Sequence, residues 1–384
     1  MKLSTDRILI THVGSLPRSD AVSEVLLAKE EGRLDSEARF EKVIAEAVVE
    51  VVKRQVEAGV DVVSDGEMGK IGYATYIKDR LTGFEGDSPR RVPADIEKFP
   101  DYIKMMSASG QTPKIKRPRC VGPIEVKDRT PLERDLANFR RAVDAAGAHD
   151  AFMPAASPGV ISVFQPNEYY KSEEAYLERL SEVMREEYEA IVNAGFVLQI
   201  DCPDLAMGRH IAYKNESDDE FVRHAEVQIE ALNHALANVP ANMVRLHLCW
   251  GNYEGPHICD IPMRKIIGTV LKAKPQALSF EAANPRHAHE WAVFKEVKLP
   301  DDKVLLPGVI DSCSNYIEHP ELVAERICRF ADIVGRERVI ASSDCGFGTF
   351  VGFGKVFPEF AYMKFKAMAE GAELASKRLW RRAA

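Results

Sequence analysis

Residues 244–250 read Val-Arg-Leu-His-Leu-Cys-Trp, an apolar run of β character that ends in a Gly251-Asn252 turn. Side chains alternate between the two faces of a strand, so His247 and Cys249 share one face. An imidazole and a thiol on the same side of a strand end are two ligands that zinc prefers. A His-x-Cys pair alone more often represents two half-buried strand residues. The stretch therefore predicts a metal site only if other strand ends supply further ligands.

Segments of β character recur along the chain, and most are followed by an amphipathic helical stretch. This alternation is typical of parallel strands joined by crossover helices. Eight such strands predict one (β/α)₈ TIM barrel over residues 1–384 rather than a doubly wound sheet. The predicted strands cover residues 8–15, 60–64, 119–125, 196–202, 244–250, 277–282, 304–311 and 339–345. The predicted helices cover residues 38–58, 131–145, 173–193, 218–237, 262–272, 287–296 and 320–334.

Two further segments do not follow this alternation. Residues 80–115 are rich in Gly, Pro and charge without a sustained period, which predicts an inserted loop region that covers the active-site mouth. Residues 151–164 are apolar, but Pro154, Pro158 and Gly159 lead us to expect an irregular or edge segment rather than a barrel strand.

Composition limits the classes of function. The chain has 384 residues, 46% of them hydrophobic, and a formal net charge of -8, which argues against a nucleic-acid partner and favours a small-molecule substrate. No window is apolar enough to span a membrane, and the start of the chain lacks a secretory core, so we expect a cytoplasmic protein. The seven cysteines are not spaced as a disulfide framework, which favours reduced thiols.

The predicted strands end in polar clusters, as expected where the carboxyl ends of barrel strands form an active site. Three of these ends offer His247 with Cys249, Glu281 in SFEAAN and Cys345 in SSDCG. Glu281 alone is more simply an ion pair and Cys345 alone a buried small side chain, but together the four predict a site for Zn²⁺. Two thiolates and a carboxylate make an electron-rich site that favours activation of a thiol over activation of water. A zinc hydrolase and a closed, non-enzymatic zinc site are the alternatives.

Carboxylates after two other strands predict recognition of an ammonium group. Asp65 and Glu67 follow the second strand, and Asp201 and Asp204 follow the fourth. Helix capping explains Asp65 and Asp204 equally well, so Glu67 and Asp201 are the better candidates.

The turn at residues 13–15 offers backbone N–H groups to a carboxylate or sulfonate, and Arg18 adds positive charge there. A plain tight turn is an equal alternative. The basic segment KRLWRR (377–382) is read as a solvated helix end or as a contact in a homo-oligomer.

The chain resembles the catalytic half of the cobalamin-independent methionine synthases. The resemblance rests on motifs in one order over nearly the whole chain: THVGSLPR (11–18), SDGE (64–67), LQIDCPD (198–204), HLC (247–249), SFE (279–281), GVIDS (308–312) and SDCG (343–346). It implies a barrel that holds catalytic zinc on His247, Cys249, Glu281 and Cys345. It also implies methyl transfer to homocysteine, with that thiol held by Ser15, Glu67 and Asp201. Glu281 and Asp311 are the expected catalytic residues.

Two positions depart from the family pattern. The Asp-x-His in which the histidine protonates the folate leaving group reads Asp311-Ser312-Cys313, and the pterin-stacking segment reads GPIEVKDRT (122–130) without an aromatic residue. The alkyl donor therefore stays open between a folate, another methyl donor and an epoxide. In the last case the thiol would be similar to coenzyme M, because the chain is also similar to epoxyalkane:coenzyme M transferase.

Overall fold

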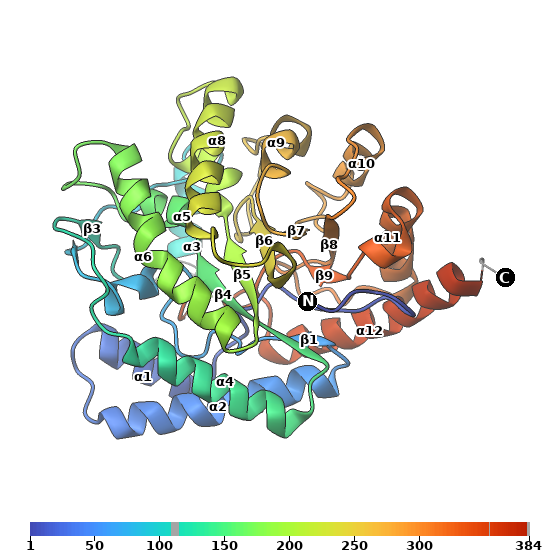
Figure 1. Ribbon diagram of the computed structural model, residues 1–384, viewed down its shortest axis with the longest axis horizontal. Helices are drawn as coiled ribbons and strands as arrows, with labels where there is room; N and C mark the ends of the chain where they lie inside the picture. The colour runs from blue at the N-terminus through green and yellow to red at the C-terminus, as the bar shows by residue number, and fades with distance from the viewer. Residues whose placement is uncertain (109–114, 353, 382–384) are drawn as a thin grey trace.

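A curled sheet of seven parallel strands forms the centre of the fold in the computed structural model (Figure 1). The structure describes residues 1–108, 115–352 and 354–381. The strand order is β1-β4-β5-β6-β7-β8-β9, so neighbouring strands follow one another along the chain. The strands are β1 (Val62–Val63), β4 (Asp150–Ala156), β5 (Val197–Asp201), β6 (Val244–Leu248), β7 (Ala277–Phe280), β8 (Val304–Ile310) and β9 (Ser342–Ser343).

The N-terminal segment 8–11 links the two edges of this sheet. Thr11 N–H donates to the Ala341 carbonyl at 2.8 Å, and Ala341 N–H donates to the Leu9 carbonyl at 2.9 Å, beside β9. On its other side, the Ile10 carbonyl accepts hydrogen bonds from Asp61 and Val62 at 3.1 and 3.2 Å, beside β1. The result is a curled α/β arrangement of the TIM-like type, although the predicted strand 8–15 forms only an isolated bridge at Ile10.

Helices surround the outer side of the sheet (Figure 1). Most predicted helices are found within one or two residues of the predicted bounds, and their serine N-caps explain where several begin: Ser172 accepts from Ala175 N–H, and Ser217 with Glu220 forms a capping box. The main helices are α1 (Asp20–Glu30), α2 (Glu37–Glu57), α3 (Pro100–Ala108), α4 (Thr130–Ala146), α5 (Pro158–Phe164), α6 (Glu173–Asn193), α7 (Gly208–Ile211), α8 (Asp218–Ala235), α9 (Met263–Val270), α10 (Val293–Glu296), α11 (Pro320–Val334) and α12 (Pro358–Arg381).

The third barrel strand is not the predicted one. Within 119–125, β3 (Arg119–Cys120) pairs antiparallel with β2 (Phe84–Glu85) in a separate two-stranded sheet. In the parallel sheet, the position expected for residues 119–125 is occupied by β4, which pairs parallel with both β1 and β5. The prediction was wrong because it treated Pro154 as incompatible with an inner strand.

The position of Pro154 explains why it is tolerated. Asp150 N–H donates to the Asp61 carbonyl on the β1 side of β4, so the nitrogen of Pro154, four residues on, faces the same side. There β1 has already ended at Val63, and no ladder hydrogen bond is lost. The Pro154 carbonyl on that side instead accepts from Lys70 Nζ at 2.5 Å.

The predicted helix 287–296 is also shorter than expected. It consists of a 3₁₀ turn (Glu290–Ala292) followed by α10. The Asn284 side chain accepts from His287 N–H at 3.0 Å, and such local bonding holds the preceding residues in a turn.

The insertion 80–115 contains β2 and α3, while its residues 109–114 lie outside the described part. Among the described residues, no helix is long and apolar enough to cross a membrane.

The interior of the sheet below the site contains a buried cation. Arg245, 1% exposed on β6, donates to Gln199 Oε1 at 2.7 Å and to Thr11 Oγ1 at 2.9 Å. Its guanidinium also lies 3.3 Å from the centre of the Phe152 ring. These contacts hold β5 and β6 together at Gln199 and Arg245. The carboxyl ends of the same two strands bear the residues described next.

Candidate metal centre and active site

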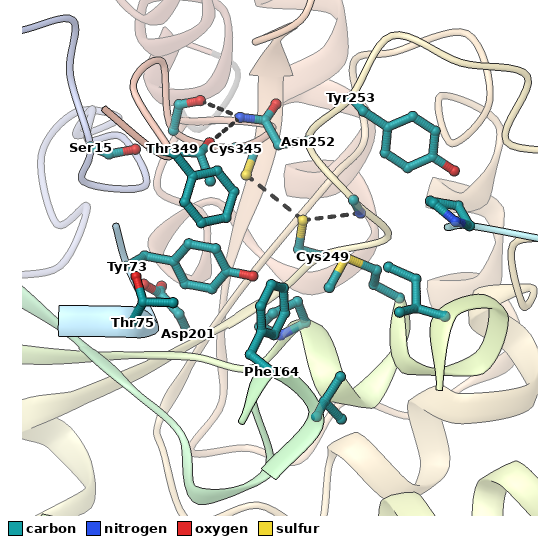
Figure 2. Close-up of a pocket in the computed structure, with 18 of the residues that line it drawn as sticks. Ser15, Tyr73, Thr75, Phe164, Asp201, Cys249, Asn252, Tyr253, Cys345 and Thr349 are labelled. Atoms are coloured by element: carbon teal, nitrogen blue, oxygen red, sulfur yellow. Dashed lines mark hydrogen bonds between the residues drawn. The ribbon is translucent and has the colours of Figure 1, made fainter. Parts of the chain in front are cut away.

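A cavity opens at the carboxyl ends of β5, β6 and β9 (Figure 2). Residues from distant parts of the chain line it together, among them Ser15, Glu67, Asp201, His247, Cys249 and Cys345. The residues that follow β5, β6 and β9 therefore lie together at one cavity. The insertion contributes Arg90, Arg91, Pro93, Ile96, Met106 and Ile115 to the same lining.

Three of the predicted metal ligands form one cluster. The ligand atoms of His247, Cys249 and Cys345 all lie within 4.8 Å of one another, and all three residues are buried. Sγ of Cys249 lies 3.7 Å from Sγ of Cys345, and both cysteines are free thiols. Nδ1 of His247 lies 3.3 Å from Ser279 Oγ, whereas its buried Nε2 has no hydrogen-bond partner among the described residues.

The histidine of the cluster is in the form that binds a cation. Burial lowers the pKa of His247 to about 3, so the imidazole is neutral, with a lone pair. Hydrogen bonding to Cys345 and burial raise the pKa of Cys249 well above its ordinary value, so this thiol keeps its proton until a bound cation displaces it. A buried unpartnered nitrogen beside two thiols is costly without a ligand, and the N/S₂ donor set is one that Zn²⁺ prefers. The residues present therefore fit a zinc ion.

Glu281 lies directly after β7, but its carboxylate is not part of that three-residue cluster. Oε1 accepts from Trp250 N–H at 2.8 Å, and Oε2 accepts from Asn284 Nδ2 at 2.8 Å. Burial raises the pKa of Glu281. Because Trp250 follows Cys249 directly, this hydrogen bond holds Glu281 at the strand end that bears Cys249, and its role as a fourth ligand stays a prediction.

Glu67 and Asp201 bring two buried carboxyl groups to the cavity. Glu67 is 1% exposed, has a left-handed φ of 58°, and its Oε2 has no hydrogen-bond partner among the described residues. Such backbone strain in a non-glycine residue is typical of functional sites. Burial and the charge of Glu67 raise the pKa of Asp201 to about 8, and burial also raises that of Glu67. An ammonium group entering between them would compensate this unneutralised pair.

Other predicted residues have structural contacts. Arg18 is not among the described residues that line the cavity, and its guanidinium donates to the carbonyls of Gly348, Glu67 and Lys70. Asp65 accepts from Glu67 N–H at 3.0 Å and so fixes the turn that presents Glu67.

Asp204 accepts from Ser157 Oγ at 2.7 Å. Asp311 accepts from Cys313 N–H at 2.9 Å, and Cys313 Sγ donates to Asn252 Oδ1 at 3.1 Å. Neither Asp311 nor Cys313 is among the described lining residues, so a catalytic role for Asp311 stays a prediction.

The sequence did not identify the aromatic and amide side chains that shape the cavity. Tyr73 packs edge-on against Phe164 at 5.7 Å, and Figure 2 shows its ring in the cavity. Asn252 donates to the Gly346 carbonyl at 2.7 Å and to Thr349 Oγ1 at 2.6 Å, which ties the β6 end to the β9 end. Its only sequence signal was its position directly after the strand that bears Cys249; Tyr73 had none.

Comparison with known proteins gives the family. The sequence profile of the cobalamin-independent synthase catalytic domain matches residues 8–102 and 159–368. The chain belongs to this family. The unmatched residues 103–158 include the segment 122–130 that lacks the expected aromatic residue.

Relatives in this family match most of the chain. It is 26% identical to the methionine synthase of Thermococcus kodakarensis over 96% of this chain and 94% of that protein. It is also 26% identical to the methionine synthase of Sulfolobus acidocaldarius over 88% of this chain and 84% of that one. The fold is similar to a B12-independent methionine synthase from Shewanella sp. W3-18-1, solved with selenomethionine (TM-score 0.73, 19% identity, 98% and 99% of the two chains). A putative B12-independent methionine synthase from Listeria monocytogenes is similar at TM-score 0.66, with 19% identity over 96% and 98% of the chains.

Proposed function

We propose that this protein is a zinc-dependent methyltransferase that alkylates the thiol of homocysteine and so forms methionine. The observation that carries the proposal is the buried His247-Cys249-Cys345 cluster, which shares one cavity with Glu67 and Asp201. In this proposal the segment 8–11 serves as the eighth strand of a (β/α)₈ barrel. The insertion then covers the mouth of that single domain.

His247 Nε2 and the two sulfur atoms would hold the zinc ion, with Glu281 as the fourth, displaceable ligand. Bound there, zinc would supply the Lewis acidity that keeps a substrate thiol deprotonated near neutral pH. Trp250 N–H and Asn284 Nδ2 orient the Glu281 carboxylate by the hydrogen bonds described above. These donors also give Glu281 a resting position when substrate replaces it.

Glu67 and Asp201 would bind the homocysteine ammonium, and Ser15 would bind its carboxylate. Both carboxyl groups are buried, and among the described residues no cation of the protein forms an ion pair with Glu67 or Asp201. An ammonium group entering there would favour the ionised form of both. Binding of the amino-acid end then orients the sulfur for in-line attack on the donor carbon.

The cavity lining supports an anionic group on one of the substrates. Arg90 and Arg91 are exposed and Lys116 and Arg117 lie beside them in the lining, whereas Cys249 and Cys345 are buried. Positive charge therefore lies at the solvent end. This suits the acidic end of a folate, and equally the sulfonate of a thiol such as coenzyme M opening an epoxide, which is the second candidate function.

Product analysis distinguishes these reactions. The zinc-loaded enzyme is incubated with homocysteine or coenzyme M and a panel of methyl donors and epoxides, and the thioether product is identified by mass spectrometry. Methionine formation with a methyl donor supports the first proposal, and a hydroxyalkyl thioether of coenzyme M supports the second. If no donor leads to thiol consumption, the alkyltransferase proposal fails, leaving a zinc hydrolase or a closed zinc site.

A further inference from the structure

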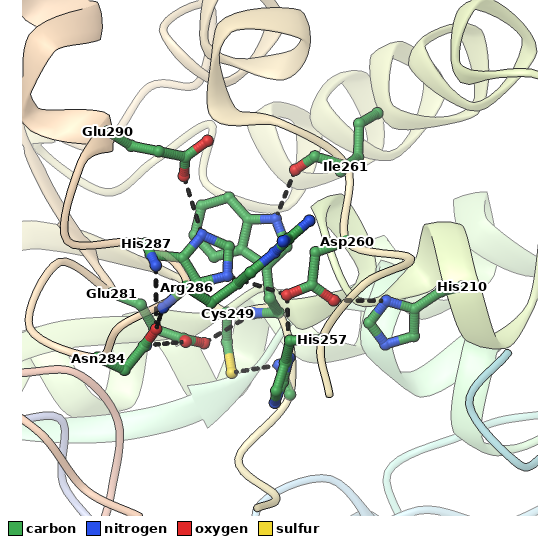
Figure 3. A network of polar contacts seen from close by, with 12 residues as sticks. His210, Cys249, His257, Asp260, Ile261, Glu281, Asn284, Arg286, His287 and Glu290 are labelled. Atoms are coloured by element: carbon green, nitrogen blue, oxygen red, sulfur yellow. Dashed lines mark hydrogen bonds and ion pairs between the residues drawn. The ribbon is translucent and has the colours of Figure 1, made fainter. Parts of the chain in front are cut away.

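A second cluster of metal-ligating groups lies beyond the end of β6, outside the cavity described above. Ligand atoms of His257, Asp260 and His287 all lie within 4.8 Å of one another (Figure 3). His287 is 3% and Asp260 8% exposed, and His257 is partly buried. Oδ2 of Asp260 lies 2.9 Å from both His257 Nδ1 and His287 Nε2.

The outer nitrogen of each imidazole has a fixed acceptor. Nε2 of His257 lies 3.0 Å from the Tyr253 carbonyl oxygen, and Nδ1 of His287 lies 2.9 Å from Glu290 Oε2. Each outer nitrogen must donate its proton to such an acceptor. In a neutral imidazole the inner nitrogen then presents a lone pair toward Asp260. This is the arrangement by which carboxylates and backbone carbonyls orient metal-bound histidines.

Stacking and a third histidine hold this arrangement in place. The Tyr253 ring stacks on His257 with centroids 4.2 Å apart, and the Trp250 ring stacks on His287 at 4.3 Å. Nδ1 of His210 lies 3.1 Å from Asp260 Oδ1. His210 is fully buried, and its Nε2 has no hydrogen-bond partner among the described residues. The side chains of His257, Asp260 and His287 are thus each held in place by a neighbouring residue.

Charge balance allows two occupants of this cluster. Asp260 and Glu290 carry two negative charges, which two imidazolium protons or one divalent cation can neutralise. Without a cation, hydrogen bonds to Asp260 and Glu290 overcome the effect of burial and raise the pKa of His287 to about 10. The same negative potential attracts a metal ion, which would displace both inner protons.

We propose that His257, Asp260 and His287 form a second, structural site for a divalent transition cation of the Zn²⁺ type, with His210 beside it. Imidazole and carboxylate donors suit such a cation, and the burial of the cluster argues for a closed site. The site would join the 253–260 loop to the segment that bears His287, on whose ring Trp250 stacks. It does not depend on the proposed methyltransferase activity.

Cobalt titration of variants tests this site. In a Cys249→Ser/Cys345→Ser variant the thiolate site is removed, and we expect one equivalent of Co²⁺ to bind, with d–d absorption but no sulfur-to-cobalt charge-transfer band. Adding Asp260→Asn should abolish binding, whereas adding His224→Gln, at an exposed histidine, should leave one equivalent.

Wild-type protein expressed with zinc provides the matching measurement without variants. We expect two zinc ions per chain by elemental analysis and a mixed S and N/O shell by zinc-edge absorption. The proposal is overturned if the double cysteine variant keeps its circular dichroism but binds no cobalt, or if the wild type holds only one zinc and that zinc has sulfur in its shell. Retention of cobalt by the Asp260→Asn variant would overturn the ligand assignment equally. Failure of the thiolate site would instead appear as absence of the charge-transfer band from wild-type protein.

Discussion

Sγ of Cys249 lies 3.7 Å from Sγ of Cys345, although 96 residues separate them in the chain. The two thiols come from the ends of β6 and β9, which are not neighbours in the sheet. Only curling of the sheet brings these strand ends to the same cavity, so this contact depends on the whole fold. In the proposed function the pair is half of a zinc shell.

Replacing Cys345 by serine should weaken zinc binding by at least about a hundredfold, since even loss of an outer-shell partner costs about 10- to 100-fold. Competition with a chromophoric chelator measures this affinity. Cys328→Ser, a change in α11 away from the cavity lining, is the matched control and should keep full affinity. Equal zinc affinity in both variants would rule out Cys345 as a ligand.

Replacing Glu67 by glutamine should raise KM for homocysteine by about 10- to 150-fold, because a hydrogen bond to a charged group contributes about 1.5–3 kcal/mol. The isosteric amide keeps the shape of the turn but removes the negative charge. Steady-state kinetics with 4-mercaptobutyrate, which is homocysteine without the ammonium group, serve as the control and should change little. A similar loss with both thiols would contradict ammonium recognition by Glu67.

Homocysteine binding should strengthen as pH rises through about 8. The free protein holds a proton on Asp201, whose pKa is raised to about 8 by burial and Glu67, and the bound ammonium requires the ionised carboxylate. Apart from the proton that the substrate thiol loses when it binds as thiolate, binding therefore releases a proton from Asp201 below this pH and none from Asp201 above it. Calorimetry in buffers of different ionisation enthalpy measures that proton, and Asp201→Asn should remove it. Proton uptake in place of release would contradict the assignment.

Replacing Arg80 by methionine should destabilise the fold by about 3–5 kcal/mol, because it leaves buried carboxylates unpaired. The guanidinium, with its side chain 7% exposed, lies 2.7 Å from Asp135 Oδ2 and 2.8 Å from Glu187 Oε2. Arg129→Met, which breaks an exposed pair with Glu186, should cost under about 1 kcal/mol. Urea denaturation measures both, and equal costs would count against a stabilising role for this network.

Local sequence signals predicted much of the fold. Helix α6 has its predicted bounds because Ser172 caps it and the apolar period is regular. The polar strand ends were also predicted, because each polar cluster directly follows an apolar run of β character. For β4 the local signal was misleading, because whether Pro154 is tolerated depends on β1 ending at Val63, a feature of another segment.

The candidate site was predictable where residue type alone carries the chemistry, as for His247 and the cysteines. The side chains around it were not, because their roles depend on partners distant in sequence. Tyr253, for example, donates to both oxygens of Asp95 in the insertion, at 3.0 and 2.9 Å. No periodicity links these two residues. The His257-Asp260-His287 cluster was missed for the same reason: its members come from two loops.

Zinc-edge X-ray absorption with and without homocysteine shows whether the substrate sulfur binds the metal. We expect the thiolate-site zinc, in protein carrying Asp260→Asn to simplify the spectrum, to gain one sulfur neighbour when homocysteine is added. We also expect the Glu67→Gln variant to need more homocysteine for the same change. An unchanged sulfur count at saturating homocysteine would contradict thiol activation at this site.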